Sequence, residues 1–219
     1  MKKFVLILFY LMLGAFLLSS NMGFKLTKTL TYAGSTYVNT NWISLPYYYL
    51  TGTVTAENVC DDIGGTCNTL GNCEAGKFNV STNSYTTWIC QTTKGTPFTV
   101  NPGEGIYIKV NANQDFVIVG SHNPTLQLNL TYAGSTYVNT NWISIPYHTT
   151  SANAENLCDE IGGTCNTLGN CEVGKFNVST NSYTTWICQT TKGTPFSLTA
   201  GEAVYVKVNT NTSFTPSHY

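Results

Sequence analysis

The chain has 219 residues, a formal net charge of −1 at pH 7 and ten basic residues, all of them lysine. This length is enough for two domains of ordinary size. A nucleic-acid interface needs a clustered basic footprint, whereas lysines such as Lys77 and Lys109 stand singly along the chain, so the composition excludes nucleic acid as a partner. Many Thr, Asn, Tyr and Ser residues predict a neutral polar surface, which is common in exported β proteins.

The N-terminus has the order of a secretory signal peptide. Lys2 and Lys3 precede an unbroken apolar run, Phe4–Leu18, and small and polar residues follow it. The run is shorter than the ~20 apolar residues of a membrane-spanning helix. We therefore expect residues 1–23 to be a signal peptide that is cleaved near Ser20 or Gly23. The mature chain would then be secreted, extracellular or at the cell surface, without a membrane anchor.

The rest of the chain is a duplication. Leu30–Tyr47 recurs as Leu130–Tyr147 with one change, and Ala56–Phe98 recurs almost unchanged as Ala154–Phe196. A repeat this long indicates two copies of a whole domain rather than a solenoid. We place the first β domain at residues 24–125 and the second at 126–219.

Within a copy, most segments are short, rich in Thr, Val, Ile and aromatic residues, and separated by Gly, Asn and Pro, as strands are. Ile106, Ile108 and Val110 alternate with Tyr107 and Lys109, which predicts a half-buried strand. We expect a mainly β fold of two tandem antiparallel β-sandwich or partly open barrel domains, each with one short helix and two disulfides. The strands predicted for the first copy are Phe24–Tyr32, Trp42–Leu45, Gly76–Val80, Tyr85–Cys90, Pro97–Val100, Ile106–Val110 and Phe116–Val119.

One helix is predicted between the second and third of these strands. Thr55 is a candidate N-cap, Val59, Cys60 and Ile63 share one face, and Gly64 stands where a left-handed stop is expected. The second copy repeats the helix around Asn156–Ile161 and ends it at Gly162.

The eight cysteines, four in each copy, are expected to form disulfides, because exported thiols meet oxidising conditions. Structural zinc sites, redox centres and haem attachment all use closely spaced Cys pairs, and the chain has no CxxC. Asp61 and Asp62 are consecutive on a helix, unlike the alternating oxygen ligands of a calcium loop. We therefore predict neither a metal nor a cofactor.

Four cysteines allow three pairings. Cys60 lies on the core-facing side of the predicted helix and Cys90 ends a predicted strand. A disulfide between them would close a loop and stabilise the fold by about 3 to 4 kcal/mol, because it lowers the entropy of the unfolded chain. We predict this nested pairing for both copies: Cys60 with Cys90, Cys67 with Cys73, Cys158 with Cys188, and Cys165 with Cys171.

Four motifs follow one another in the first copy: a strand with Trp before Ile-Ser-Leu-Pro, a helix from Thr-Ala-Glu to Ile-Gly, a strand with Trp, and a closing Gly-x-Gly-x-Tyr strand. They are Trp42–Pro46, Thr55–Gly64, Trp88, and Phe98 with Gly103, Gly105 and Tyr107. This series resembles a β module of secreted bacterial proteins that often occurs in tandem or beside adhesive domains. Some members of that family also carry a helix cysteine and one after the strand Trp, and this resemblance supports Cys60–Cys90. The chain departs from the pattern in Cys67, Cys73 and Ala203, and the resemblance implies no catalytic residues.

We predict that the protein is not an enzyme, because no nucleophile, base and orienting group are repeated together in the two copies. The histidines are His122, His148 and His218, and none is equivalent between the copies. Glu104 and Glu202 are equivalent, as are Glu57 and Glu155, but each is a single acid, and a glycosidase needs two acids facing each other.

Aromatic residues support carbohydrate binding as an alternative function. The range Tyr47–Tyr49 with Tyr85, Trp42 and Trp88 could make a platform for surface glycans, although a strand Trp is more often a core residue. Four sequons are acceptors for N-glycans where the host has the machinery, and their asparagines are Asn79, Asn129, Asn177 and Asn211.

The principal functional hypothesis is an exported structural or adhesive surface protein, with self-assembly into an extracellular filament as its sharper form. Phe24–Leu30 resembles Thr125–Leu130, the segment that joins the copies, and the second copy ends without such a segment. The N-terminal strand of one molecule could therefore join the end of another head to tail, giving a homopolymer. The expected assembly strand carries Phe24, Leu26, Thr27 and Leu30. The alternative is that both segments are first strands of their own domains.

Overall fold

The computed structural model describes residues 23–34, 40–45, 53–64, 73–92, 94–121, 126–134, 140–162, 171–188 and 192–217. The predicted signal peptide, apart from Gly23, lies outside the described residues. Among the residues described, no helix is long and apolar enough to cross a membrane.

The first copy forms a five-stranded antiparallel sheet in the order β2-β6-β3-β4-β5, a separate ribbon of β1 and β7, and one helix, α2. The bounds are β1 Gly23–Leu30, β2 Asn41–Ser44, α2 Ala56–Gly64, β3 Glu74–Asn79, β4 Ser84–Ile89, β5 Lys94–Gly95, β6 Gly105–Lys109 and β7 Gln114–Ser121, with a 3-10 turn η1 at Cys90–Thr92.

The second copy repeats this arrangement, with a sheet in the order β9-β13-β10-β11-β12, a short ribbon of β8 and β14, and the helix α3. The bounds are β8 Leu128–Leu130, β9 Asn141–Ser144, α3 Ala154–Gly162, β10 Glu172–Asn177, β11 Ser182–Ile187, β12 Lys192–Gly193, β13 Ala203–Lys207 and β14 Thr212–Phe214.

Each copy has its own core between the ribbon, the helix and one face of the five-stranded sheet. In the first copy Leu30 and Ile118 come from the ribbon, Ile108 from the sheet and Val59 from α2, and all are buried. Period-two alternation aims the strand side chains inward, since successive residues of a strand face opposite sides, and Val59 lies on the buried face of α2. The mainly β, sandwich-like fold with one short helix per copy is confirmed.

Local chemistry explains where the helices begin. The Thr55 hydroxyl accepts a hydrogen bond from the Asn58 amide at 3.3 Å, and in the second copy Asn153 Oδ1 accepts one from the Asn156 amide at 2.9 Å. These contacts satisfy amides that an α-helix leaves without partners at its start. The expected left-handed stop at Gly64 and Gly162 is wrong, because both end their helices without a positive φ.

The predicted disulfide pairing is also wrong. Cys60 of α2 bonds to Cys73, with their Cα atoms 5.6 Å apart, and Cys158 bonds to Cys171 in the same way. Cys90 and Cys188 are disulfide-bonded as well, while Cys67 and Cys165 lie outside the described residues. The cause lies in the register of β3 and β4, where Glu74 pairs with Ile89 and the Cys90 amide donates to the Cys73 carbonyl at 2.9 Å. Cys73 and Cys90 therefore lie side by side near α2, and either could have met Cys60.

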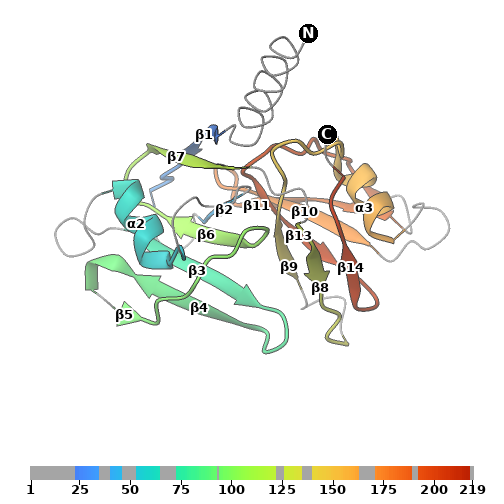
Figure 1. Cartoon of the computed structure of the whole chain (residues 1–219), viewed down its shortest axis with the longest axis horizontal. Coiled ribbons are helices and arrows are strands. Elements are labelled where there is room, and N and C mark those ends of the chain that lie inside the picture. The colour runs from blue at the N-terminus through green and yellow to red at the C-terminus, as the bar shows by residue number, and fades with distance from the viewer. Residues whose placement is uncertain are drawn as a thin grey trace, which may run out of the picture.

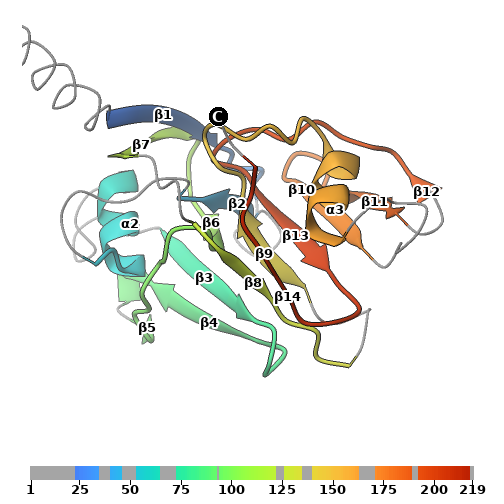
Figure 2. The same ribbon diagram turned by 45° about the vertical axis from the view of Figure 1, so that its right-hand side comes forward.

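The two copies pack against each other with equivalent faces (Figures 1 and 2). Figure 1 shows α2 and α3 on the two outer flanks and β2, β6, β9 and β13 between them. Isolated bridges join Ile43 to Glu202 and Glu104 to Ile143, which are the same pair of positions with the copies exchanged. The chain is thus an internal pseudo-dimer, and its contact has the isologous form of a two-fold dimer.

Candidate functional site

The junction is built around two stacked tryptophans. The indole rings of Trp42 in β2 and Trp142 in β9 have centroids 3.3 Å apart and planes inclined by 3°. Next to them Ser144 Oγ donates a hydrogen bond to Ser44 Oγ at 2.9 Å. All four side chains are buried, so the stack and the serine pair define the pseudo-two-fold axis of the molecule.

A tyrosine supports each tryptophan from its own sheet. Trp42 pairs with Tyr107 across β2 and β6, and their rings meet edge to face at 5.6 Å. The Tyr107 ring lies over Gly76 of β3, where any Cβ would overlap it. Its hydroxyl donates to Glu74 at 2.8 Å. Burial first, and then this hydrogen bond, raises the pKa of Tyr107, so the phenol stays protonated and keeps donating.

The second copy holds Tyr205 in the same way. Its ring meets Trp142 edge to face at 5.6 Å and lies over Gly174, and its hydroxyl donates to Glu172 at 2.7 Å. Burial and the hydrogen bond to Glu172 likewise raise the pKa of the Tyr205 phenol. Both tyrosines are therefore fixed parts of the junction.

An aromatic groove opens beside the stack. We use this name for the hollow of about 390 Å³ that is lined by Phe78, Asn83, Tyr85, Thr140, Trp142, Tyr183, Tyr205 and Lys207. Tyr85 and Tyr183 are equivalent residues of the two copies, and each is 51% exposed. Their rings lie 5.6 Å from those of Tyr107 and Tyr205 respectively. The groove therefore has a buried aromatic floor, two half-exposed phenols and a polar rim.

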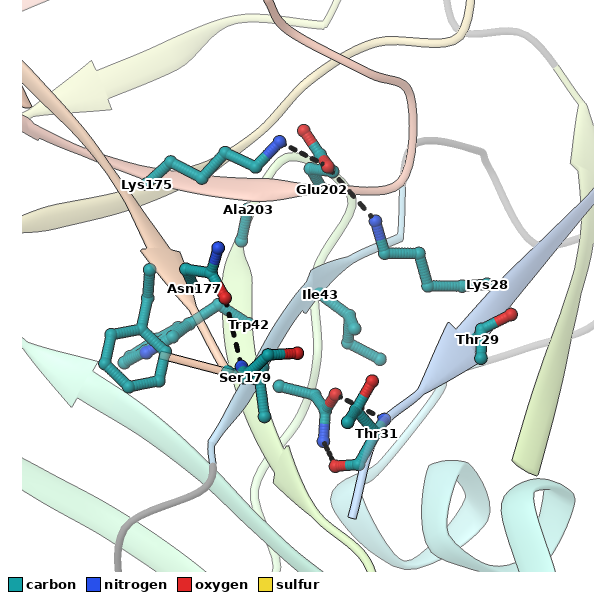
Figure 3. A pocket seen from close by; sticks show the side chains of 13 residues that line it. Lys28, Thr29, Thr31, Trp42, Ile43, Lys175, Asn177, Ser179, Glu202 and Ala203 are labelled. Atoms are coloured by element: carbon teal, nitrogen blue, oxygen red, sulfur yellow. Dashed lines mark hydrogen bonds and ion pairs between the residues drawn. The ribbon is translucent and has the colours of Figure 1, made fainter. Parts of the chain in front are cut away.

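A second hollow, of about 230 Å³, lies beside Trp42 and contains charged groups from both copies (Figure 3). Lys28 of β1 and Lys175 of β10 approach the Glu202 carboxylate from different sides, at 3.5 and 2.7 Å. Burial lowers the pKa of Lys28, and attraction to Glu202 only partly offsets this effect. Oε2 of Glu202 is buried and has no hydrogen-bond partner among the described residues.

The equivalent hollow on the other side of the stack differs in charge. It measures about 320 Å³, and Lys77 binds Glu104 there at 2.6 Å. The Asn101 amide donates to the other oxygen of Glu104 at 3.1 Å. Leu128 occupies the position of Lys28 and is buried. The two hollows therefore differ in charge, because one contains Lys28 and the other contains Leu128 at the equivalent position.

The first strand of each copy also packs against the other copy. The Phe24 ring lies 4.5 Å from that of Tyr147 and 4.7 Å from that of His148. Leu26 lies against Gly201, while Leu126 and Leu128 lie against Gly103, the equivalent glycine. These contacts hold the copies together within one chain.

The residues of the expected assembly strand are thus divided by the fold. Phe24 and Leu26 contact the second copy, Leu30 is in the core of the first, and Thr27 is exposed. All of them belong to β1, which pairs with β7 of its own copy. The other expected segment behaves alike, since β8 pairs with β14.

Only part of the expected aromatic platform comes together. The rings of Trp42 and Tyr85 lie 6.5 Å apart, and Tyr85 lines the groove, but Trp88 is buried in the core of the first copy. Tyr47–Tyr49 lies outside the described residues. The four sequon asparagines are exposed, and the side-chain oxygen of each accepts a hydrogen bond. The donors are Ser81 for Asn79, Ser213 for Asn129, Ser179 for Asn177, and Tyr132 for Asn211.

The two equivalent pairs of candidate acids lie in different parts of the fold. Glu104 and Glu202 lie at the junction, whereas Glu57 and Glu155 are in the first turns of the outer helices. His122 and His218 lie outside the described residues. Within the described ranges, no three His, Cys, Asp or Glu side chains gather as a metal would require.

Four residues of the junction and the groove were not predicted as site residues from the sequence: Trp142, Tyr107, Tyr205 and Tyr183. A signal was present, because Trp42 and Tyr107 both lie on strand faces opposite the core, and both recur in the second copy. Large aromatic residues on a face that should be solvated indicate that another surface covers that face.

Comparison of the chain with protein-family models, with curated proteins and with solved structures gave no match. The resemblance to the β module of secreted bacterial proteins therefore stays a prediction.

Proposed function

We propose that the chain is an exported structural or adhesive protein of the cell surface. The observation that carries this proposal is the construction of the body: two β domains interlocked through a buried aromatic junction, each with its helix joined by a disulfide to the residue that precedes the central strand of its sheet. Disulfides form and persist in oxidising compartments. They suit a protein whose work is to stay folded outside the cell.

The test is to produce the full chain in the native host and to follow it by immunogold labelling and protease accessibility on intact cells. We expect label at the surface or in the medium, and a version lacking residues 1–23 that stays inside. Full-length chain that remains in the cytoplasm with reduced cysteines would overturn the proposal.

One observation favours the filament form as a second candidate. Val117 and Val119 of β7 are 44% and 55% exposed, and they face outward beside Thr27 and Lys25 of β1. The ribbon of the second copy is much shorter. The outer face of the β1–β7 ribbon therefore presents two exposed valines beside polar residues, and it offers a surface for the ribbon of another molecule.

The structure also changes the design of the filament test. Deleting β1 would remove the buried Leu30 and break the first core, so loss of polymers would not identify a contact between molecules. We instead expect long polymers of the mature protein by negative-stain microscopy, and monomers for the double variant Val117→Lys/Val119→Lys. The exposed control Thr210→Lys should polymerise normally. Polymers formed by the double variant would rule out the ribbon as the contact.

A further inference from the structure

We infer that the aromatic groove binds a neutral, linear glycan whose chain crosses the pseudo-two-fold axis, with one sugar ring on Tyr85 and another on Tyr183. This inference deepens the proposed function and rests on it in one respect, since it supplies the adhesive protein with a ligand. The exposure, the charge and the symmetry of the groove support it.

The exposure of the two tyrosines points to a ligand with flat apolar faces. Tyr85 and Tyr183 are half exposed, while Trp142 and Tyr205 beneath them are buried. Large aromatic residues normally bury most of their surface, and a ring held half open over a packed aromatic floor is fixed in place to receive a partner. The apolar face of a pyranose ring fits such a surface, and its hydroxyls stay available to polar groups at the edge.

The polar lining of the groove selects against charge. Its only ammonium group, that of Lys207, is paired with Glu172 at 3.0 Å. The remaining polar groups at the rim are the amide of Asn83 and the hydroxyl of Thr140. Burial raises the pKa of both half-exposed phenols, which therefore remain neutral. Neutral donors and acceptors complement sugar hydroxyls and offer no unpaired charge to an ionic ligand.

Symmetry then gives the shape of the ligand. The groove takes Phe78 and Tyr85 from the first copy and Tyr183 and Tyr205 from the second, so it continues across the axis. Its volume of about 390 Å³ is within the ~300–1,000 Å³ of small-ligand sites. Tyr85 and Tyr183, the equivalent tyrosines of the two copies, suit a polymer of equivalent units. Among neutral glycans, β-1,4-linked hexopyranose chains are extended and flat, and their chemically equivalent rings follow one another in alternating orientation.

The experiment measures binding of the full mature chain to cello- and chito-oligosaccharides of two to six sugars by calorimetry, together with retention on insoluble cellulose and chitin. We expect affinity to rise with chain length for at least one of the two series. For the hexamer, Tyr85→Ala and Tyr183→Ala should each lose about tenfold in affinity, and the double variant should lose detectable binding. The matched control is Tyr132→Ala, since Tyr132 is exposed but does not line the groove.

Three results would overturn the inference: no binding of either series, binding that the two tyrosine variants leave unchanged, or binding only of a polyproline peptide, the other polymer that lies on exposed tyrosines. A surface-located protein without glycan binding would overturn this inference and leave the proposed function standing. Glycan binding that depends on the groove, by a chain that stays in the cytoplasm, would support this inference and overturn the proposed function. The unfolding midpoint of each variant, measured beside that of the wild type, separates lost binding from lost folding, because both rings also contact buried neighbours, Tyr107 and Tyr205.

Discussion

Lys28 is the residue at which the two halves of the junction differ most clearly. It holds an ammonium group near Glu202, whereas the equivalent Leu128 packs against Gly103. Glu202 already has a closer partner in Lys175, at 2.7 Å. A buried ion pair is often no more stabilising than an apolar pair of similar size, because two charges must leave water. Replacing Lys28 by leucine tests this balance, because the second copy already carries a leucine, Leu128, at the equivalent position.

We predict that Lys28→Leu leaves the free energy of unfolding at pH 7 unchanged or raises it by up to about 2 kcal/mol. The pKa of Lys28 is lowered in the folded state, so the unfolded chain holds this proton more tightly, and protonation costs folding stability at neutral pH. That cost disappears as the pH rises from the lowered pKa towards 10.5. The advantage of the leucine variant should therefore shrink over this window.

Urea unfolding with intact disulfides, at pH 7 and at pH 10, measures the effect. Lys25→Leu is the control, because Lys25 is exposed on the same strand. A loss of more than about 1 kcal/mol in Lys28→Leu at pH 7 would show that the Lys28–Glu202 pair is net stabilising.

The individual strands and helices show which parts of the fold local sequence can predict. Thr55 marked a helix start, and apolar alternation marked β6, because capping and period two act within a few residues. Alternation also predicted that Tyr107 would face solvent, yet it is only 6% exposed. The other copy covers Tyr107. Contacts between domains produce no periodic pattern in the sequence, so alternation could not predict this burial. The cysteine pairing failed for a similar reason, since the β3–β4 register brings Cys73 and Cys90 to the same place.

Strand β10 supplies the prediction at this scale. Gly174→Ala should lower the free energy of unfolding by about 2–3 kcal/mol, because a Cβ there would overlap the ring of Tyr205, which Trp142 and Glu172 hold in place. Gly162→Ala is the matched control: none of the described residues comes within 4 Å of the added atom, and we expect a change within about 0.5 kcal/mol. Chemical denaturation compares the two, and equal stabilities would contradict the packing of Tyr205 over β10.

At the scale of the whole molecule, the duplication makes a closed pseudo-dimer rather than an open series. Both copies use the same face, and both first strands reach across to the Pro-Gly or Ala-Gly turn of the other copy. While each chain keeps its own two copies paired, both of these faces are occupied, and we expect contacts between such chains to use another surface, such as the outer face of β7. A ligand in the aromatic groove would meet residues of both copies.

The arrangement of the copies is tested most directly by a cross-link on the axis. Ser44 and Ser144 are buried and their hydroxyl oxygens are 2.9 Å apart, so cysteines at both positions are close enough to form a disulfide. For Ser44→Cys/Ser144→Cys, the structure predicts that peptide mapping without reduction finds the two copies joined through positions 44 and 144, while Ser44→Cys alone keeps a free thiol. Two free thiols in the double variant, with the Cys60–Cys73 and Cys158–Cys171 bonds intact, would contradict the face-to-face packing of the copies.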